Sequence, residues 1–182
     1  MDELIKADLY RYVPEKYSLT CLLRGFRSQG FRYMFVKRKV DKLKKRSIKW
    51  FILRVVLRHY TYKFGYQIAG EIGEGLYISH FGTIIVSNKA TIGKNCNIAC
   101  GVTIGATRRG PNAGVPTIGN EVWMGTNSII VGDIKIGNNV LIAPGAFVNF
   151  NVPDNSIVIG NPGVIKYSPK ATEGYINNKV GY

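Results

Sequence analysis

Hydrophobic residues recur at every sixth position through the second half of the chain. The strictest run holds Ile118, Met124, Ile130, Ile136, Ile142 and Val148. A helix repeats near 3.6 residues and a strand repeats every two, so a period of six fits neither as one continuous element. It fits short strands separated by tight corners, whose apolar side chains become buried when one coil stacks on the next. The pattern therefore predicts a mainly β protein, a parallel β-helix of hexapeptide repeats.

The same repeat extends upstream with two interruptions. Its inward positions there are Ile72, Ile78, Ile84, Ile92, Ile98 and Ile104. The step from Ile84 to Ile92 exceeds the period of six by two residues, and the step from Ile104 to Ile118 exceeds it by eight. Because three strands make one triangular coil, both insertions leave the prism at the same corner. The longer one, residues 106–117, is expected to be a protruding loop, and loops of this length on a rigid scaffold are often functional.

Helical signals come before the repeat. Residues 1–12 are expected to form a short helix that ends near Pro14. A second short helix is predicted over 19–26, and Gly30 is expected to end it. From there, 31–62 is predicted to be one long, basic, amphipathic helical stretch.

The pattern divides the chain into a basic helical segment (1–65), a β-helix (66–167) and a tail (168–182) that is expected to be loose. The net charge is +14, and 17 basic against 5 acidic residues place +12 of it within residues 1–67. Aromatic residues are interleaved with the basic ones. Such a surface suits anionic lipid headgroups, worth about 1 kcal/mol per basic residue; a solvated helix face beside an oligomer contact is the alternative. Nucleic acid is not expected as a partner, because no recognition motif accompanies the charge.

The cysteines Cys21, Cys96 and Cys100 have no spacing typical of a metal site or a disulfide framework. No signal peptide is expected at the N-terminus. The longest apolar run, 50–57, is interrupted by Arg54 and is shorter than the roughly 20 residues needed to cross a bilayer. These features predict a cytoplasmic protein, with peripheral contact at the inner face of the cell membrane as an option.

The two histidines differ in their surroundings. His59 lies among apolar and basic helical residues, which favours a structural role. His80 follows the inward Ile78 by two residues, a phase that is mostly polar in the other repeats, so it is expected to face outward. An imidazole that titrates near neutrality on a rigid wall is a candidate general base, and an idle surface histidine is the alternative.

The repeat also predicts which residues stack beside His80. The column is expected to run through His80, Cys100, Thr126 and Pro144 at steps of about 4.8 Å. A histidine and a cysteine together can form a covalent acyl enzyme. The simpler interpretation, that Cys100 is small and leaves room for a ligand, is favoured because no third group orients the pair.

Residues 66–166 resemble the hexapeptide-repeat acyltransferases. The resemblance rests on the motifs SHFG, IGATRRG, EVWMG and GNPG within the repeat. It is strongest to the serine acetyltransferase-like branch, which includes O-acetyltransferases of bacterial surface polysaccharides. It implies a left-handed β-helix, acetyl-CoA as donor and co-substrate, and a homotrimer with active sites between subunits. The handedness comes from the resemblance, because general crossover rules favour right-handed connections.

The resemblance assigns roles to individual residues. The histidine of SHFG, His80, corresponds to the catalytic base of the family. Glycine-rich coil edges that line the CoA channel correspond to Gly105, Ala106, Gly125, Thr126, Ala143 and Pro144. The GNPG turn places Pro162 and Lys166 near the adenine end of CoA.

Departures from the family pattern concern the acceptor. Serine acetyltransferases carry an Asp where this chain has Ser79, and an Arg-His-Pro where it has residues 114–116. The family's upstream Asp aligns near Gly65. Because a zwitterionic amino acid needs charged partners, the expected acceptor is a neutral sugar hydroxyl. The candidate substrate-binding residues are Ser79, Cys100, Trp123, Arg108 and Arg109.

The sequence thus predicts an acetyl-CoA-dependent O-acetyltransferase acting on a sugar hydroxyl of a capsule, an O-antigen or a precursor of either. A serine O-acetyltransferase is the enzymatic alternative, and a non-catalytic, membrane-associated β-helix scaffold is the other. No metal is expected, since a zinc site with three imidazoles needs more than two histidines. Outward apolar residues that a trimer would cover are Trp123, Ile129, Leu141 and Phe147.

Overall fold

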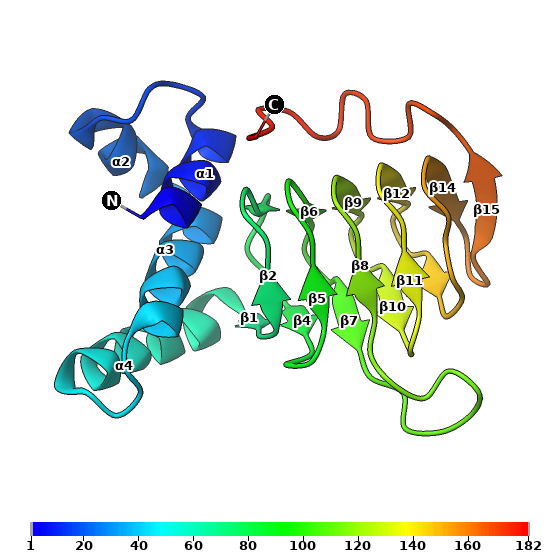
Figure 1. Cartoon of the computed structure of the whole chain (residues 1–182), viewed down its shortest axis with the longest axis horizontal. Coiled ribbons are helices and arrows are strands. Elements are labelled where there is room, and N and C mark those ends of the chain that lie inside the picture. The colour runs from blue at the N-terminus through cyan, green and yellow to red at the C-terminus, as the bar shows by residue number, and fades with distance from the viewer. Residues whose placement is uncertain (1, 182) are drawn as a thin grey trace.

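The computed structural model describes residues 2–181. Four helices stand at one end of a three-sided prism of short strands (Figure 1). The helices are α1 (Glu3–Tyr12), α2 (Leu19–Gly25), α3 (Gln29–Lys42) and α4 (Ile48–Phe64). Asp2 and Ser18 cap the first two, accepting hydrogen bonds from the backbone N–H groups of Leu4 and Cys21 at 3.0 and 3.1 Å.

The prism consists of three sheets that take strands in rotation. Sheet A holds β1 (Tyr66–Ile68), β4 (Ile84–Val86), β7 (Thr103–Gly105), β10 (Ile129–Val131) and β13 (Phe147–Val148). Sheet B holds β2 (Glu71–Ile72), β5 (Thr91–Ile92), β8 (Thr117–Ile118) and β11 (Lys135–Ile136). Sheet C holds β3 (Tyr77–Ile78), β6 (Asn97–Ile98), β9 (Val122–Met124), β12 (Val140–Ile142), β14 (Ser156–Ile159) and β15 (Val164–Tyr167). All pairs are parallel except β14 with β15, so the predicted parallel β-helix is confirmed.

The six-residue period marks the inside of the prism. None of the six residues that follow this period from Ile118 to Val148 is more than 3% exposed. The two insertions connect β4 to β5 and β7 to β8, so both leave at the corner between sheets A and B, as predicted.

Asparagine side chains tie the corners between sheets B and C. The backbone N–H of Lys94 donates to Asn120 Oδ1 at 2.8 Å, and that of Asn120 donates to Asn138 Oδ1 at 2.8 Å. The N–H of Asn138 donates in turn to Asp154 Oδ1 at 2.7 Å. Each corner is therefore held by the next coil, which keeps the register fixed along the prism.

The prediction of one helix over 31–62 is wrong, because residues 43–47 separate α3 from α4. Arg46 adopts a left-handed backbone there (φ 68°), and Ser47 Oγ accepts a hydrogen bond from the N–H of Trp50 at 3.2 Å. Gly30 lies buried inside α3 and does not end α2. The turn lets α4 fold back and pack against α3.

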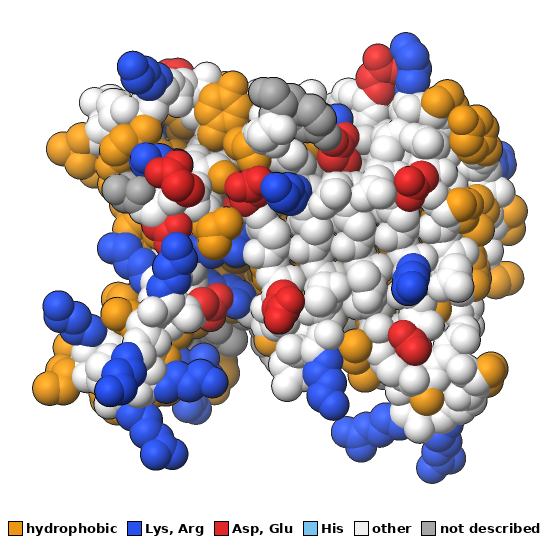
Figure 2. Space-filling view, viewed as in Figure 1, with side chains coloured by type: hydrophobic (Ala, Val, Ile, Leu, Met, Phe, Trp, Pro, Cys, Tyr) orange, Lys and Arg blue, Asp and Glu red, His pale blue; other side chains and the backbone are white. Residues whose placement is uncertain are grey.

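Lysine and arginine side chains gather around the helical end of the molecule (Figure 2). The basic run is not one solvated face, however, because Lys37 and Arg38 are buried. Lys37 pairs with Asp41 at 2.7 Å, and Arg38 pairs with Asp8 at 2.9 Å. The exposed part of the run is therefore shorter than the sequence predicts.

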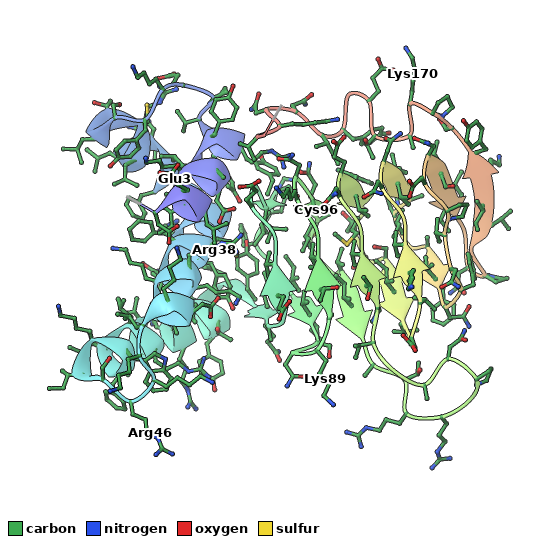
Figure 3. All side chains as sticks on the ribbon, viewed as in Figure 1. Glu3, Arg38, Arg46, Lys89, Cys96 and Lys170 are labelled. Atoms are coloured by element: carbon green, nitrogen blue, oxygen red, sulfur yellow. The ribbon has the colours of Figure 1, made fainter. Side chains whose placement is uncertain are left out.

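Asp8 and Arg38 close the open end of the prism. Arg38, on α3 beside the first coil (Figure 3), donates to the carbonyls of Ile72 and Gly73, both at 2.5 Å. Asp8 Oδ1 accepts from the N–H of Gly75 at 3.0 Å. The terminal edge of a stacked sheet leaves such backbone groups without partners. The helices supply them, so the two buried charges cap the solenoid.

The tail after β15 runs back along the prism toward α1 (Figure 1). The backbone N–H of Thr172 donates to Asn139 Oδ1 at 3.2 Å, and Asn97 Nδ2 donates to the carbonyl of Tyr175 at 3.0 Å. Thr172 is buried, together with Ala171 and Ile176. The prediction of a loose tail is therefore wrong, and β15 was not predicted at all.

The tail also changes the expected outer surface. Leu141 is only 7% exposed, and Trp123 is half-buried against Tyr175 of the tail, with ring centroids 4.9 Å apart. Leu141 therefore offers almost no surface for a trimer to bury, and the tail covers part of Trp123. Ile129 remains exposed and Phe147 half-buried on sheet A.

Candidate functional site

A cleft of about 480 Å³ lies between sheet C and the returning tail. Its lining includes Tyr77, Ser79, His80, Asn97, Trp123 and Tyr175. The predicted base thus meets the cleft edge together with two of the predicted substrate residues, Ser79 and Trp123. Residues from the first, second and third coils and from the tail build one site.

Aromatic rings form two parts of the cleft wall. Tyr12 of α1 lies against Tyr77, with ring centroids 4.5 Å apart and an interplanar angle of 35°. Trp123 and Tyr175 form the other pair, tilted by 58°. Flat apolar walls of this kind suit a ligand with an apolar face and polar edges.

Arg11 is buried in the cleft wall, and its three side-chain nitrogens each donate a hydrogen bond. Its Nη1 donates to the carbonyl of Gly75 and its Nη2 to Asn97 Oδ1, both at 2.6 Å. Its Nε donates to the carbonyl of Asn177 at 2.9 Å. Burial lowers the pKa of Arg11 from its ordinary value. Arg11 therefore orients α1, the first coil and the tail, and within residues 2–181 the cleft lining contains no Asp or Glu.

His80 is exposed at the cleft edge, as its phase in the repeat predicts. The hydroxyl of Tyr66 donates to the backbone carbonyl of His80 at 3.1 Å. Burial raises the pKa of Tyr66 far above its ordinary value, so the hydroxyl stays a donor. No hydrogen bond within residues 2–181 reaches the imidazole itself, which leaves both ring nitrogens available to a ligand.

The strand register of sheet C builds a ledge at the corner with sheet A. Pairing of β3, β6, β9, β12 and β14 places in one row the residues His80, Cys100, Thr126, Pro144 and Gly160. Four steps of strand spacing make the ledge roughly 19 Å long. At its far end, the turn 160–163 contains Pro162 and leads into β15, where Lys166 is exposed. A Cβ added at Gly145 would meet nothing within 4 Å, so the ledge is open there.

The three cysteines are free and differ in access. Cys96 is buried inside the prism (Figure 3), and burial raises its pKa to about 12. Cys21 is buried among the helices, and Cys100 is half-buried on the ledge. Across residues 2–181 no cluster of His, Cys, Asp and Glu could hold a metal ion. His59 lies exposed on α4, outside the cleft, so it is no packed core residue.

The predicted CoA-binding residues occupy two different corners. Gly125, Thr126, Ala143 and Pro144 belong to the ledge, whereas Gly105 and Ala106 lie at the corner between sheets A and B. A single chain therefore does not bring all of them together.

The loop over 106–116 leaves beside Gly105 and carries the exposed Arg108 and Arg109. Thr107 and Gly114 pair across its base, and Asn112 Nδ2 donates to the carbonyl of Asn149 at 2.8 Å. The loop is thus tied to a later coil, and its arginines lie away from the cleft.

Sequence reasoning missed several cleft residues. Tyr77, Asn97 and Trp123 share one column of sheet C, so the repeat phase that selected Trp123 also pointed to the other two. Arg11 and Tyr175 come from segments without a repeat, and no sequence signal placed them here.

Comparison with known proteins agrees with this architecture. A family profile described as "Bacterial transferase hexapeptide (six repeats)" matches residues 116–149. A serine acetyltransferase of Synechococcus elongatus is 35% identical over 97 residues, which are 53% of this chain and 40% of the relative. The putative colanic acid biosynthesis acetyltransferase WcaB of Escherichia coli is 37% identical over 105 residues, which are 57% of this chain and 64% of the relative. The chain thus spans less than two thirds of either curated relative.

A solved structure shares the fold over most of the chain. The serine acetyltransferase of Brucella abortus in complex with coenzyme A superposes with a TM-score of 0.74 and 25% identity. The match covers 91% of this chain and 67% of that one. With the six-residue repeat and the three-sided prism, these similarities show that the chain has the fold of the hexapeptide-repeat transferases and is similar to serine acetyltransferases and to WcaB.

Proposed function

We propose that the chain transfers the acetyl group of acetyl-CoA to a sugar hydroxyl of a bacterial surface polysaccharide or its precursor. The observation that carries the proposal is the cleft beside His80. Its lining includes aromatic rings and amides, and the described lining residues include no carboxylate to bind an ammonium group. A neutral acceptor with several hydroxyl groups and an apolar face matches that lining better than a zwitterion does.

His80 acts as the general base in this proposal. It takes the proton of the acceptor hydroxyl as the oxygen forms its bond to the acetyl carbon and the carbon–sulfur bond of the thioester breaks. The imidazolium then returns the proton to the departing sulfur. Such proton transfer contributes about 10²- to 10⁴-fold to a rate.

The ledge is the proposed binding surface for acetyl-CoA, which supplies the activated acetyl group. It begins at His80, is lined by small residues such as Thr126, and ends near Pro162 and Lys166. Lys166 forms no ion pair within residues 2–181, so its charge is available to a phosphate.

A homotrimer would complete the donor site. On the outer face of sheet A, the register aligns Ile85, Thr103, Ile129 and Phe147, and both isoleucines are 38% exposed. A second copy packed on this face would bring its own Gly105 corner toward the ledge. Light scattering at micromolar concentration should give three times the chain mass, and Ile129→Asp should shift it toward monomer. A monomeric wild-type chain would remove the shared site.

The acceptor is tested with purified full-length chain and acetyl-CoA. Release of the CoA thiol should be much faster with nucleotide sugars or surface oligosaccharides than with L-serine, and mass spectrometry should find acetyl on the sugar. Cells that lack the chain should produce surface glycan without that acetyl group. Saturation by L-serine at sub-millimolar concentration would reverse the proposal.

Serine O-acetylation is the second candidate, because the Synechococcus and Brucella proteins are named serine acetyltransferases. It requires a partner for the ammonium group of the amino acid, and the described cleft lining contains no carboxylate. Titration of the wild-type chain with L-serine in a calorimeter distinguishes the two. A folded chain that binds neither acceptor nor acetyl-CoA would instead favour the scaffold alternative.

A further inference from the structure

Helix α4 carries apolar residues on two opposite faces. One face, with Leu57 and Phe64, is buried against α3 and the prism. The other points to solvent, and its apolar residues are 54–81% exposed: Ile48, Phe51, Ile52, Val55 and Tyr62. Their spacing of three, four and seven residues places them in one stripe. We call these five residues the outer stripe.

Basic residues flank the outer stripe on both sides. At 100° per residue, Lys49 and Lys63 project from one side of it and Arg54 and Arg58 from the other. Lys44, Lys45 and Arg46 stand at the turn that begins the helix. Within residues 2–181 no acidic side chain pairs with Lys44, Lys45 or Lys49. Figure 2 shows this combination of basic and apolar side chains at the helical end.

A groove of about 680 Å³ adjoins the stripe between α4 and the other helices. Its apolar lining includes Ile5, Leu22, Phe35 and Leu53, and Ile52 belongs both to this lining and to the outer stripe. Lys39, Lys42 and Lys49 lie among its lining residues. Lys39 lies over the Phe35 ring at 4.3 Å, and Lys42 pairs with Asp2 at 2.5 Å. The groove is therefore apolar inside and mainly cationic at its polar positions.

We propose that α4 and this groove form a docking surface for a bilayer that contains anionic phospholipid. The outer stripe enters the boundary between headgroups and acyl chains, the flanking cations meet the phosphates, and the groove receives part of an acyl chain. An amphipathic surface with apolar and cationic residues in this arrangement binds in the plane of the interface. No helix within residues 2–181 is long and apolar enough to cross a membrane, so the contact is peripheral.

Charge selects the lipid over a second copy of the chain. Residues 1–67 carry +12, so two such segments face to face would repel each other, whereas an anionic lipid surface attracts each one. This inference goes beyond the proposed reaction and does not depend on it, because neither the cleft nor the ledge takes part.

The test is flotation of the full-length chain with vesicles of phosphatidylcholine alone or mixed with phosphatidylglycerol. Binding should require phosphatidylglycerol and weaken as salt is added. The pair Lys45→Glu and Lys49→Glu should weaken binding at least tenfold, since the loss of each lysine charge is worth about fivefold and each glutamate adds a negative charge. The matched control, Lys89→Glu with Lys135→Glu, makes the same charge change on the prism and should retain most of the binding.

A second pair tests the stripe itself. Phe51→Ser with Ile52→Ser should weaken binding by about tenfold, while Val164→Ser, on exposed β15, should not. Circular dichroism melts verify folding, and the exposed lysine pair keeps the test valid if the serine pair fails to fold. Equal binding to both vesicles, or equal loss with the prism lysines, would overturn the proposal. A changed mass of the serine pair in light scattering would show that the stripe contacts a second copy, which would also overturn it.

Discussion

The two ends of the prism are covered differently. Side chains from two helices cover the first coil, whereas at the last coil a strand of the same sheet, β15, pairs through its backbone. Asp8 and Arg38 are buried and bond the first edge, and β15 turns back to pair with β14 at the other. Buried charges tolerate only one arrangement of partners, so they fix the coil that carries His80. Backbone pairing makes no such demand on side chains, and all four residues of β15 remain exposed.

The largest expected effect concerns the chemistry of the first coil. His80→Ala should lower acetyl transfer by about 10²- to 10⁴-fold, because no other described base lines the cleft. The melting temperature should stay unchanged, since the side chain is exposed. CoA release with the best sugar acceptor measures the rate, and His59→Ala is the control. A near-normal rate would contradict the proposed role of His80 as the general base.

Next in size is the cap itself. Asp8→Ala should lower the free energy of unfolding by about 3–5 kcal/mol, because Arg38 would remain buried without its anion. Urea unfolding followed by circular dichroism measures this. Glu3→Ala removes the exposed partner of Lys6 and should cost less than about 1 kcal/mol. Similar costs for both variants would contradict the role assigned to the buried Asp8–Arg38 pair as the cap of the first coil.

At the last coil, Lys166 is expected to contribute to the binding of acetyl-CoA and not to the stability of the fold. Lys166→Ala should raise the KM for acetyl-CoA by roughly five- to tenfold with kcat unchanged, as expected for loss of a phosphate contact that is equal in the ground and transition states. Steady-state kinetics at saturating acceptor would test it. A fall in kcat alone would assign Lys166 to some other role.

The middle of the prism offers a smaller test of packing. Ser128 is fully buried, and its hydroxyl has no hydrogen-bond partner within residues 2–181. Ser128→Ala should therefore stabilise the fold by about 1 kcal/mol. Thermal unfolding would show a higher midpoint, and a lower one would mean that an unseen partner satisfies the hydroxyl.

The smallest effect is expected at Cys100, beside His80. Cys100→Ser should keep activity within about twofold, because transfer passes directly from donor to acceptor. In the folded chain iodoacetamide should label Cys100 and spare Cys96, whose raised pKa and burial keep it a thiol. Mass spectrometry of the protein detects both the iodoacetamide label and any acetyl group bound to a cysteine. A competent acetyl thioester on Cys100 would contradict the proposed direct transfer.

The features of the structure that depend on the six-residue period were predicted from the sequence. Inward residues, strand register, both insertion corners and the exposure of His80 follow from a spacing of six, because stacked coils repeat the same environment. Ser47 ahead of Ile48 was also a readable helix start, yet the continuous basic and apolar pattern across 43–47 concealed the turn.

Contacts between distant segments were beyond such reasoning. Asp8 and Arg38 belong to separate helices and read as surface charges on each. The tail is held partly by polar contacts, such as that of Asn139 with Thr172, that follow no period. One wall of the cleft therefore depends on tertiary structure that local patterns do not encode.

The returning tail has a consequence for how the molecule loses its structure. A stack held only by neighbouring coils can fray from either end, one coil at a time. Here the tail leaves the last strand, crosses the middle coils and reaches α1, where the carbonyl of Asn177 accepts a hydrogen bond from Arg11, 166 positions away. Neither end can then peel away without also releasing contacts at the other. The tail therefore couples the two ends of the stack, and we expect the coils to unfold together in one cooperative transition.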